Sequence, residues 1–120
     1  MESESPLERV RAICMAFPET EERLSHGEPT WFVRGKRTFA TFADRHHDSR
    51  VAVWFAAPPG AQEIVPPSAP DRYFVPPYWG PSGWLAAYLD VPVDWDEVGE
   101  IVQDAYRVVA PNRLVAGLDA

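Results

Sequence analysis

Apolar side chains recur at helical spacing close to the N-terminus of the chain. Ser5 and Glu8 stand three residues apart, as in an N-terminal capping box, and Pro6 takes the first helical position, where its missing N–H costs nothing. Pro18 stops the pattern. We therefore expect a helix over residues 5–17 with one buried face. That face consists of Leu7, Val10, Ile13, Cys14 and Phe17.

The middle of the chain carries the period-two pattern of β-strands. Residues 31–33 and 38–43 are rich in β-branched and aromatic side chains and flank Gly35, which predicts a hairpin with a tight turn. After a polar loop, the stretch "VAVWFAA" alternates Val53 and Phe55 against Ala52 and Trp54. We expect it to continue the meander as a third strand.

The C-terminal half begins with a proline-rich connection. Residues 58–81 contain eight of the 13 prolines, which excludes a long helix or a central strand there, although "GAQEIV" can form one or two helical turns. The stretch "GWLAAYLDV" predicts a strand. Asp94 then caps a helix that Pro111 ends, and Glu97 is expected to complete a second capping box. Gly99 inside this helix costs about 1 kcal/mol relative to alanine, so we expect it to mark a close approach to another element.

This order of elements places the chain in the α+β class. A helix, antiparallel strands, a short helical turn, a strand and a second long helix succeed one another, which predicts helices packed on one face of an antiparallel sheet. The two long helices are expected to lie side by side. No internal repeat or linker divides the sequence, so we expect residues 1–120 to form a single domain.

Composition and charge argue against several classes of protein. The formal net charge is −7, from 18 acidic and 11 basic residues, which argues against a protein whose whole surface grips nucleic acid. No apolar run approaches the roughly 20 residues of a membrane span, and the acidic start "MESESPLERV" is unlike a signal peptide. Cys14 is the only cysteine, which excludes an intramolecular disulfide and fits a reducing compartment. We expect a cytoplasmic protein with no membrane partner.

Basic residues gather between residues 34 and 50. A hairpin tip there is expected to offer guanidinium and ammonium groups to the phosphates of a nucleic acid. The alternative is that charged turns only keep exposed strands soluble. The adjacent His46 and His47 make a poor pair of metal ligands, because neighbouring side chains of an extended chain point in opposite directions. The candidate phosphate-binding residues are Arg34, Lys36, Arg37, Arg45 and Arg50.

The stretch "YFVPPYWGPSGW", residues 73–84, is dense in rings, prolines and glycines. Its prolines stiffen the chain and its glycines permit tight bends, which predicts a rigid corner that leads a half-buried Trp84 into a strand. Rings ahead of this corner are candidates to stack on a base or another flat ligand. The alternative is that they pack over the sheet. The aromatic cleft candidates are Trp31, Tyr78, Trp79 and Trp84.

No motif in the sequence indicates catalysis. A P-loop and a dinucleotide-binding fingerprint are absent, and Ser82 in "GPSGW" lacks the surroundings of a nucleophile elbow. Cys14 lies in the apolar stripe of the first helix, where burial makes a thiol a poor nucleophile. One helix face carries the acidic residues Glu97, Glu100 and Asp104. Such a face is typical either of a binding site for a hard cation or of an ordinary solvent-exposed surface. We expect no catalytic residue, no metal site and no cofactor.

Three segments resemble, in order and spacing, those of the MmcQ/YjbR family of small bacterial proteins: "HGEPTWFVRGKRTFATF", "PPYWGPSGWLAAYLD" and "DWDEVGEIVQDAYRVVAP". The resemblance covers nearly the whole chain. It implies a frataxin-like (CyaY-like) fold and DNA binding through so-called double-wing hairpins, with no catalytic residue. It assigns to the first hairpin Gly27, Pro29, Gly35, Lys36 and Phe39, and to the second signature Tyr78, Gly80, Gly83 and Trp84.

Together these observations predict a small non-catalytic binding module. One hypothesis is that it binds DNA or another nucleic acid through its basic hairpin tips. The alternative is an adaptor for a small molecule or for another protein.

Overall fold

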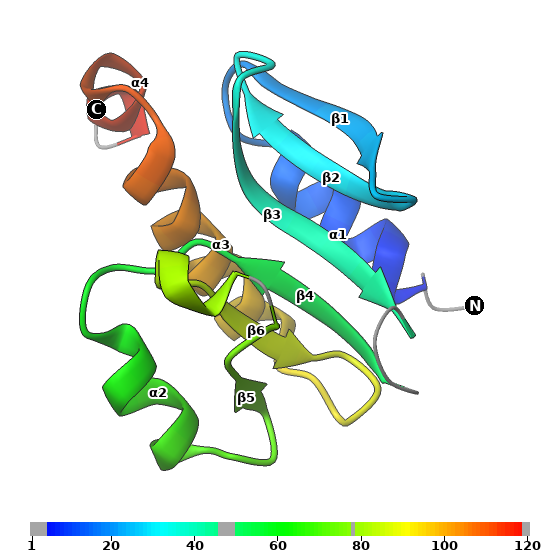
Figure 1. Ribbon diagram of the computed structural model, residues 1–120. Coiled ribbons are helices and arrows are strands. Elements are labelled where there is room, and N and C mark those ends of the chain that lie inside the picture. Colours follow the sequence, from blue (N-terminus) through cyan, green and yellow to red (C-terminus); the bar gives the residue numbers. More distant parts are fainter. Residues whose placement is uncertain (1–4, 46–49, 78, 119–120) are drawn as a thin grey trace.

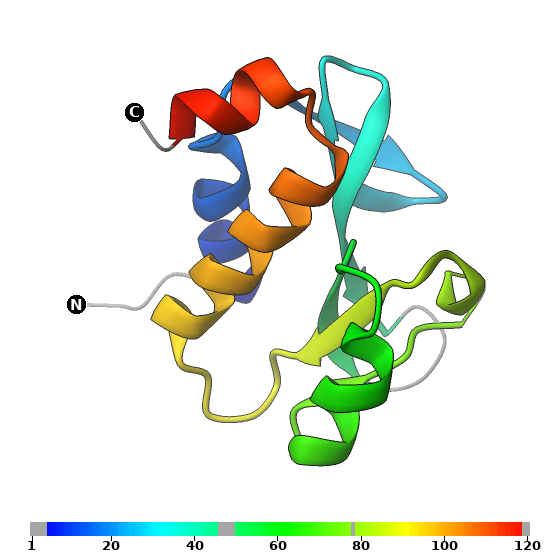
Figure 2. The same cartoon turned by 90° about the vertical axis from the view of Figure 1, so that its left-hand side faces the viewer.

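The computed structural model describes residues 5–45, 50–77 and 79–118. There the chain forms one antiparallel sheet of six strands in the order β1-β2-β3-β4-β6-β5, with α1 and α3 on one of its faces (Figures 1 and 2). This is the α+β arrangement that the sequence pattern predicts. The elements are α1 (Pro6–Met15), β1 (Thr20–Ser25), β2 (Glu28–Val33), β3 (Arg37–Asp44), β4 (Val51–Phe55), α2 (Ala61–Ser68), β5 (Tyr73–Phe74), the 3-10 helix η1 (Gly80–Ser82), β6 (Leu85–Tyr88), α3 (Trp95–Val109) and α4 (Asn112–Leu118).

The strand register assigns each side chain to one of two faces of the sheet. Thr30 of β2 pairs with Thr41 of β3, and Thr41 pairs with Trp54 of β4. Because paired residues point to the same side, these three side chains share one face, and their neighbours Trp31 and Val53 point to the other. The face that carries Trp31 is covered by α1 and α3; the opposite one is called the open face below.

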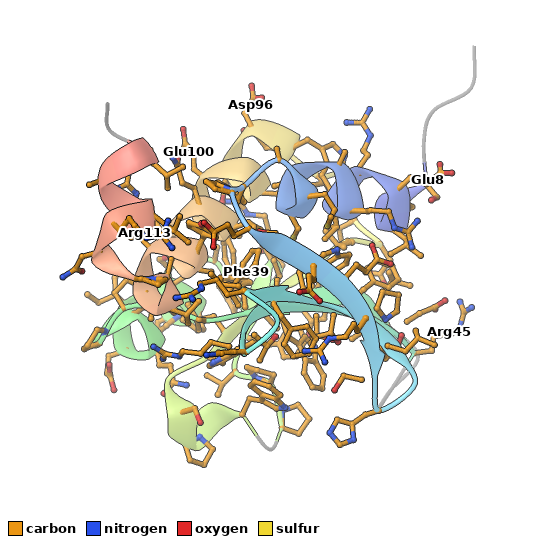
Figure 3. The ribbon with its side chains drawn as sticks, turned by 90° about the horizontal axis from the view of Figure 1, so that it is seen from above. Glu8, Phe39, Arg45, Asp96, Glu100 and Arg113 are labelled. Atoms are coloured by element: carbon orange, nitrogen blue, oxygen red, sulfur yellow. The ribbon has the colours of Figure 1, made fainter. Side chains whose placement is uncertain are left out.

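The main core lies between the covered face and the helices. Val10 of α1 and Val102 and Tyr106 of α3 have no exposed surface. The ring of Phe39 in β3 meets the Tyr106 ring edge-on, with centres 5.4 Å apart, and lies in the interior in Figure 3. Helices α1 and α3 contact one another, as the sequence pattern predicts for the two long helices.

The capping box at the start of α1 is confirmed. The Ser5 hydroxyl accepts the Glu8 N–H at 3.1 Å, and the Glu8 carboxylate accepts the Ser5 N–H at 3.1 Å. Pro6 occupies the first turn, as expected.

The second capping box, expected at α3, is only half formed. The Asp94 carboxylate accepts the N–H groups of Asp96 and Glu97, at 3.1 and 3.2 Å. The Glu97 carboxylate, however, accepts hydrogen bonds from the Tyr73 hydroxyl and from Arg72. A partly buried hydroxyl and a cation from another element therefore replace the backbone N–H of the cap as its partners.

Gly99 does not mark a close approach within α3. A Cβ atom placed on it would meet no atom of the described residues within 4 Å. The expectation drawn from its helix-breaking tendency was therefore wrong.

Strand β1 lies at one edge of the sheet and is not evident from the sequence. Half of its segment "TEERLS" is charged, and charged side chains are one way in which natural edge strands avoid pairing with other chains. Glu22 holds it in place: its carboxylate accepts two hydrogen bonds from Arg11 of α1, at 2.7 and 2.9 Å, and one from the Trp31 indole at 3.1 Å. The hydrogen bonds from Arg11 lower the pKa of Glu22 below its usual range.

No helix in the described part of the chain is long and apolar enough to span a bilayer.

Candidate functional site

A cavity of about 560 Å³ opens on the open face, above β2, β3 and β4. It is called the sheet-face cavity below. Four aromatic residues line it: Phe32, Phe42, Trp54 and Trp79. Its polar lining comes from Ser25, His26, Glu28, Thr30, Thr38 and Thr41.

The floor of the cavity follows from the strand register. Thr30, Thr41 and Trp54 lie side by side on three adjacent strands, and Phe32 pairs with Thr38 next to them. The hydroxyl oxygens of Thr30 and Thr41 are 2.7 Å apart and share a hydrogen bond. Small β-branched side chains in the middle of the sheet leave the space that larger residues would fill.

The wall of the cavity comes from the corner ahead of β6. Trp79 is half-buried, and the centre of its ring lies 4.1 Å from that of Trp84. Gly83 takes a φ of +85°, which L-residues with a side chain rarely adopt, so the chain bends sharply there. Gln62 of α2 donates a hydrogen bond to the Trp84 carbonyl at 2.8 Å and so fastens the corner to α2. Figure 2 shows η1 on the side of the sheet opposite α1 and α3.

The aromatic residues singled out from the sequence occupy different places. Trp79 lines the sheet-face cavity. Trp84 lies behind it and is only 5% exposed, so it is more deeply buried than expected. Trp31 has no exposed surface and points to the covered face, where a ligand on the open face does not reach it. Tyr78 lies outside the described residues.

Three aromatic residues of the cavity lining, Phe32, Phe42 and Trp54, were not among the sequence candidates. A signal for Trp54 was present, because the alternation in "VAVWFAA" separates it from Val53 and Phe55, which face the core. For Phe32 the same reasoning applies on β2, once Trp31 is known to face the helices.

The basic residues between 34 and 50 do not form one surface. Arg34 and Lys36 stand at the β2–β3 turn, whereas Arg45 and Arg50 flank the β3–β4 connection. Strand β3 separates these ends: the seven steps from Arg37 to Asp44, at about 3.4 Å each, span about 24 Å. The described basic residues of the two connections thus lie at opposite ends of β3.

The arginines of this group have partners within the chain. Arg34 lies 3.6 Å from Glu19, and Arg45 lies 3.2 Å from Asp44. Arg37 donates a hydrogen bond to the Val109 carbonyl at 3.3 Å. These contacts engage part of the positive charge of the three arginines. The sequence had suggested that this charge was available to phosphates.

Arg50 makes the shortest of these ion pairs. Its guanidinium donates two hydrogen bonds of 2.8 Å to the Asp90 carboxylate and lies 3.9 Å from the centre of the Tyr88 ring. The hydrogen bonds from Arg50 lower the pKa of Asp90 to about 2. This geometry joins the loop after β6 to the start of β4 and is a structural contact.

The acidic residues of α3 are spread over different surroundings. Glu97 is bonded to Tyr73, and burial, followed by this hydrogen bond, raises the pKa of Tyr73 to about 12. Glu100 points away from the sheet in Figure 3. Within residues 5–45, 50–77 and 79–118, no three histidine, cysteine or acidic side chains gather closely enough to hold a metal ion. His46 and His47 lie outside those ranges.

Cys14 is fully buried in the core beneath α1. Burial raises the pKa of its thiol far above the usual range, so the thiol stays protonated. This placement agrees with the core position that the helical pattern predicts.

The fold and the cavity define a class: a small α+β domain whose sheet has two helices on one face and a lined cavity on the other. The YjbR family model matches residues 15–108, and the chain belongs to that family. A crystal structure of the Deinococcus radiodurans protein DR2400, with a DUF419 domain, shares this fold with a TM-score of 0.71 and 17% sequence identity. The alignment covers 86% of this chain and 77% of that one. No curated protein matches the chain significantly.

Proposed function

We propose that this protein is a non-catalytic binding module that takes a small, flat ligand into the sheet-face cavity. The observation that carries the proposal is the cavity itself. Its volume of about 560 Å³ falls in the range of small-molecule sites, roughly 300 to 1,000 Å³. Phe32, Trp54 and Trp79 supply flat apolar surfaces, and the polar groups between them supply direction.

The hydrogen bonding of the cavity supports binding over catalysis. The hydroxyls of Thr30 and Thr41 bond to one another and to the carbonyls of Glu28 and Pro29. An activated hydroxyl nucleophile instead needs a general base within hydrogen-bond reach. The cavity is thus equipped to recognise a ligand by shape and hydrogen bonds.

The test is a titration followed through the indole N–H signals of the five tryptophans in ¹H–¹⁵N spectra. Small aromatic compounds that are cationic, neutral or anionic serve as probes. We expect saturable shifts for Trp54 and Trp79, which line the cavity, and none for Trp31, which is buried on the covered face. Failure of every probe to shift Trp54 or Trp79 at millimolar concentration contradicts the proposal.

A pair of variants makes this test specific. Trp79→Ala removes a half-buried wall of the cavity and should weaken binding of every probe at least about fivefold, since aromatic stacking contributes about 1 to 3 kcal/mol. Trp95→Ala is the control, because Trp95 is also half-buried but lies at the start of α3 against Arg9. Equal losses in both variants would point to general destabilisation and count against the site.

Nucleic-acid binding at the β2–β3 turn is the second candidate. It is favoured by the exposure of Arg34, Lys36 and Arg37, which lie together at that turn. It requires the β2–β3 turn alone to hold the phosphate backbone of the nucleic acid, because Arg45 and Arg50 are at the other end of β3.

We further infer that the protein works in a reducing compartment such as the cytoplasm, which fits a sequence with a single cysteine.

Electrophoretic mobility shifts with duplex and single-stranded DNA test the second candidate. If the turn binds phosphates, the double variant Arg34→Ala/Lys36→Ala should weaken binding equally for all sequences and reduce the salt slope by about 1 per lost contact. The matched control is Arg72→Ala, an exposed arginine ahead of the edge strand β5 that is paired with Glu97. An unchanged slope in the double variant would exclude the turn as the binding surface.

A further inference from the structure

The hydroxyl protons on the floor of the sheet-face cavity are already engaged. The Thr30 hydroxyl reaches the Glu28 carbonyl at 3.1 Å and the Thr41 oxygen at 2.7 Å, and the Thr41 hydroxyl reaches the Pro29 carbonyl at 3.2 Å. The Thr38 hydroxyl donates to the Trp31 carbonyl at 3.2 Å. Since each hydroxyl has one proton and two lone pairs, what remains for a ligand at these oxygens is acceptor capacity.

The charged groups of the cavity favour the same kind of ligand. Glu28 contributes a carboxylate, one oxygen of which lies 3.4 Å from the Asp44 N–H. None of the described residues that line the cavity is a lysine or an arginine. Arg23 pairs with Thr30 and so shares its face of the sheet: its guanidinium lies 4.0 Å from the centre of the Phe32 ring and donates to the Gly35 carbonyl at 2.9 Å. It is thus engaged at the edge of the cavity and does not line it.

The aromatic walls add to this preference. The faces of Trp and Phe rings carry negative charge density and attract cations, by about 0.5 to 2 kcal/mol depending on exposure. Trp54 and Trp79 therefore favour a ligand that is both flat and positively charged, whereas Phe32, which Arg23 already covers, offers apolar contact only. An anion would meet a carboxylate, hydroxyl lone pairs and ring faces, and among the described lining side chains His26, Ser25 and the two indole N–H groups could donate a hydrogen bond to it.

We propose that the ligand of the sheet-face cavity is a cationic aromatic compound whose N–H groups donate to Glu28 and to the Thr30–Thr41 pair. This inference rests on the proposed small-ligand function and gives it a chemical class. Aromatic amidines and protonated amino-heterocycles belong to this class. Aromatic carboxylates and phosphate esters do not.

Three probes of nearly equal size test the class: benzamidine, benzamide and benzoate, which are cationic, neutral and anionic at neutral pH. Their affinities are measured from the Trp54 and Trp79 indole signals. We expect benzamidine to bind at least about tenfold more tightly than benzoate, with benzamide in between, because hydrogen bonds to charged groups contribute about 1.5 to 3 kcal/mol.

A variant that removes the charge of Glu28 tests whether this residue causes the preference for a cationic ligand. Glu28→Gln keeps the size of the side chain and should lower the affinity for benzamidine about threefold to tenfold while changing that for benzamide less than about twofold. Glu63→Gln is the control, because Glu63 is an exposed carboxylate on α2 that does not line the cavity. Both variants remove one negative charge, so a general effect of net charge would appear equally in each.

The outcomes separate the two proposals. Benzoate binding as tightly as benzamidine, with shifts at Trp54 and Trp79, would overturn the cationic class and leave the binding module standing. Equal effects of Glu28→Gln and Glu63→Gln would overturn the assigned contact. Absence of binding by all three probes, together with the wider panel, would overturn the proposed function.

Discussion

At the scale of single residues, the structure is held by a few polar pairs that connect segments far apart in sequence. Arg50 and Asp90 are 40 positions apart and make a bidentate ion pair, and Arg11 and Glu22 join α1 to the edge strand β1. Both carboxylates have a lowered pKa because an arginine donates hydrogen bonds to the charged form. Such pairs stabilise the fold only where the carboxylate is ionised.

The Arg50–Asp90 pair makes stability depend on pH. The pKa of Asp90 falls from 3.8 to about 2 in the folded protein, so its contribution is complete above pH about 4 and is lost as the pH falls toward about 2. Since the pair is partly exposed, we expect Asp90→Asn to lower the free energy of unfolding by about 1 kcal/mol at pH 7. Urea unfolding of both proteins from pH 7 to pH 2 measures this difference.

The same difference should shrink to nearly zero at the acidic end of that series. Asp71→Asn is the control, because Asp71 is exposed in a turn. A difference for Asp90→Asn that stays constant down to pH 2 would show that the substitution acts through packing and not through the ion pair.

At the scale of elements, local signals set where the helices begin, and long-range partners set what their side chains do. The capping box of α1 needs only Ser5 and Glu8, and it forms. Glu97 has the same spacing from Asp94, but the Tyr73 hydroxyl competes for its carboxylate. A capping box that the sequence predicts therefore forms only where no tertiary partner competes for the capping side chain.

Two glycines with room for a methyl group allow a clean test of backbone effects. Gly99→Ala in α3 should raise the free energy of unfolding by about 0.5 to 1 kcal/mol, because alanine is the better helix former and its Cβ meets nothing within 4 Å. Thermal and urea unfolding measure the change.

Gly83→Ala is the matched comparison. A Cβ there also meets nothing within 4 Å, but the residue has a φ of +85°. We expect a loss of about 1 kcal/mol, because an L-residue with a Cβ is strained in the left-handed region. A gain at Gly83 or a loss at Gly99 would contradict the backbone account.

At the scale of the whole molecule, the two faces of the sheet have different roles. The covered face carries the main core, with Trp31, Phe39 and Tyr106 fully buried, and the open face carries the cavity. The radius of gyration is 13.6 Å, as expected for a compact chain of this length, about 14 Å. The floor of the cavity is thus the back of the core, which holds its side chains in place.

Because the faces share one sheet, we expect them to unfold together. Tyr106→Phe removes the hydrogen bond of 2.8 Å that the Tyr106 hydroxyl donates to the Pro18 carbonyl, and should lower the free energy of unfolding by about 1 kcal/mol. Tryptophan fluorescence and far-ultraviolet circular dichroism should report one coincident transition before and after the change. Separate transitions would show that the helix layer and the open face are independent.

The sequence by itself determined the features that depend on neighbouring residues. Ser5, Pro6 and Glu8 start α1, Asp94 starts α3, and period-two alternation places Val53 and Phe55 opposite Trp54. The α+β class followed from this order of elements, and the family followed from the resemblance of three sequence segments. These features are local because a helix cap spans three residues and a strand reverses its side-chain direction at every step.

Only the tertiary structure decided which residues meet. It buried Trp31 on the covered face, put Arg34 and Arg50 at opposite ends of the sheet, and paired a charged segment, β1, as an edge strand. It also brought Trp79 and Thr41, 38 positions apart in the sequence, into the lining of one cavity. The physical reason is that a cavity is formed by strand register and by the path of a loop, and both are set by packing across the whole sheet and not by the residues beside each one in sequence.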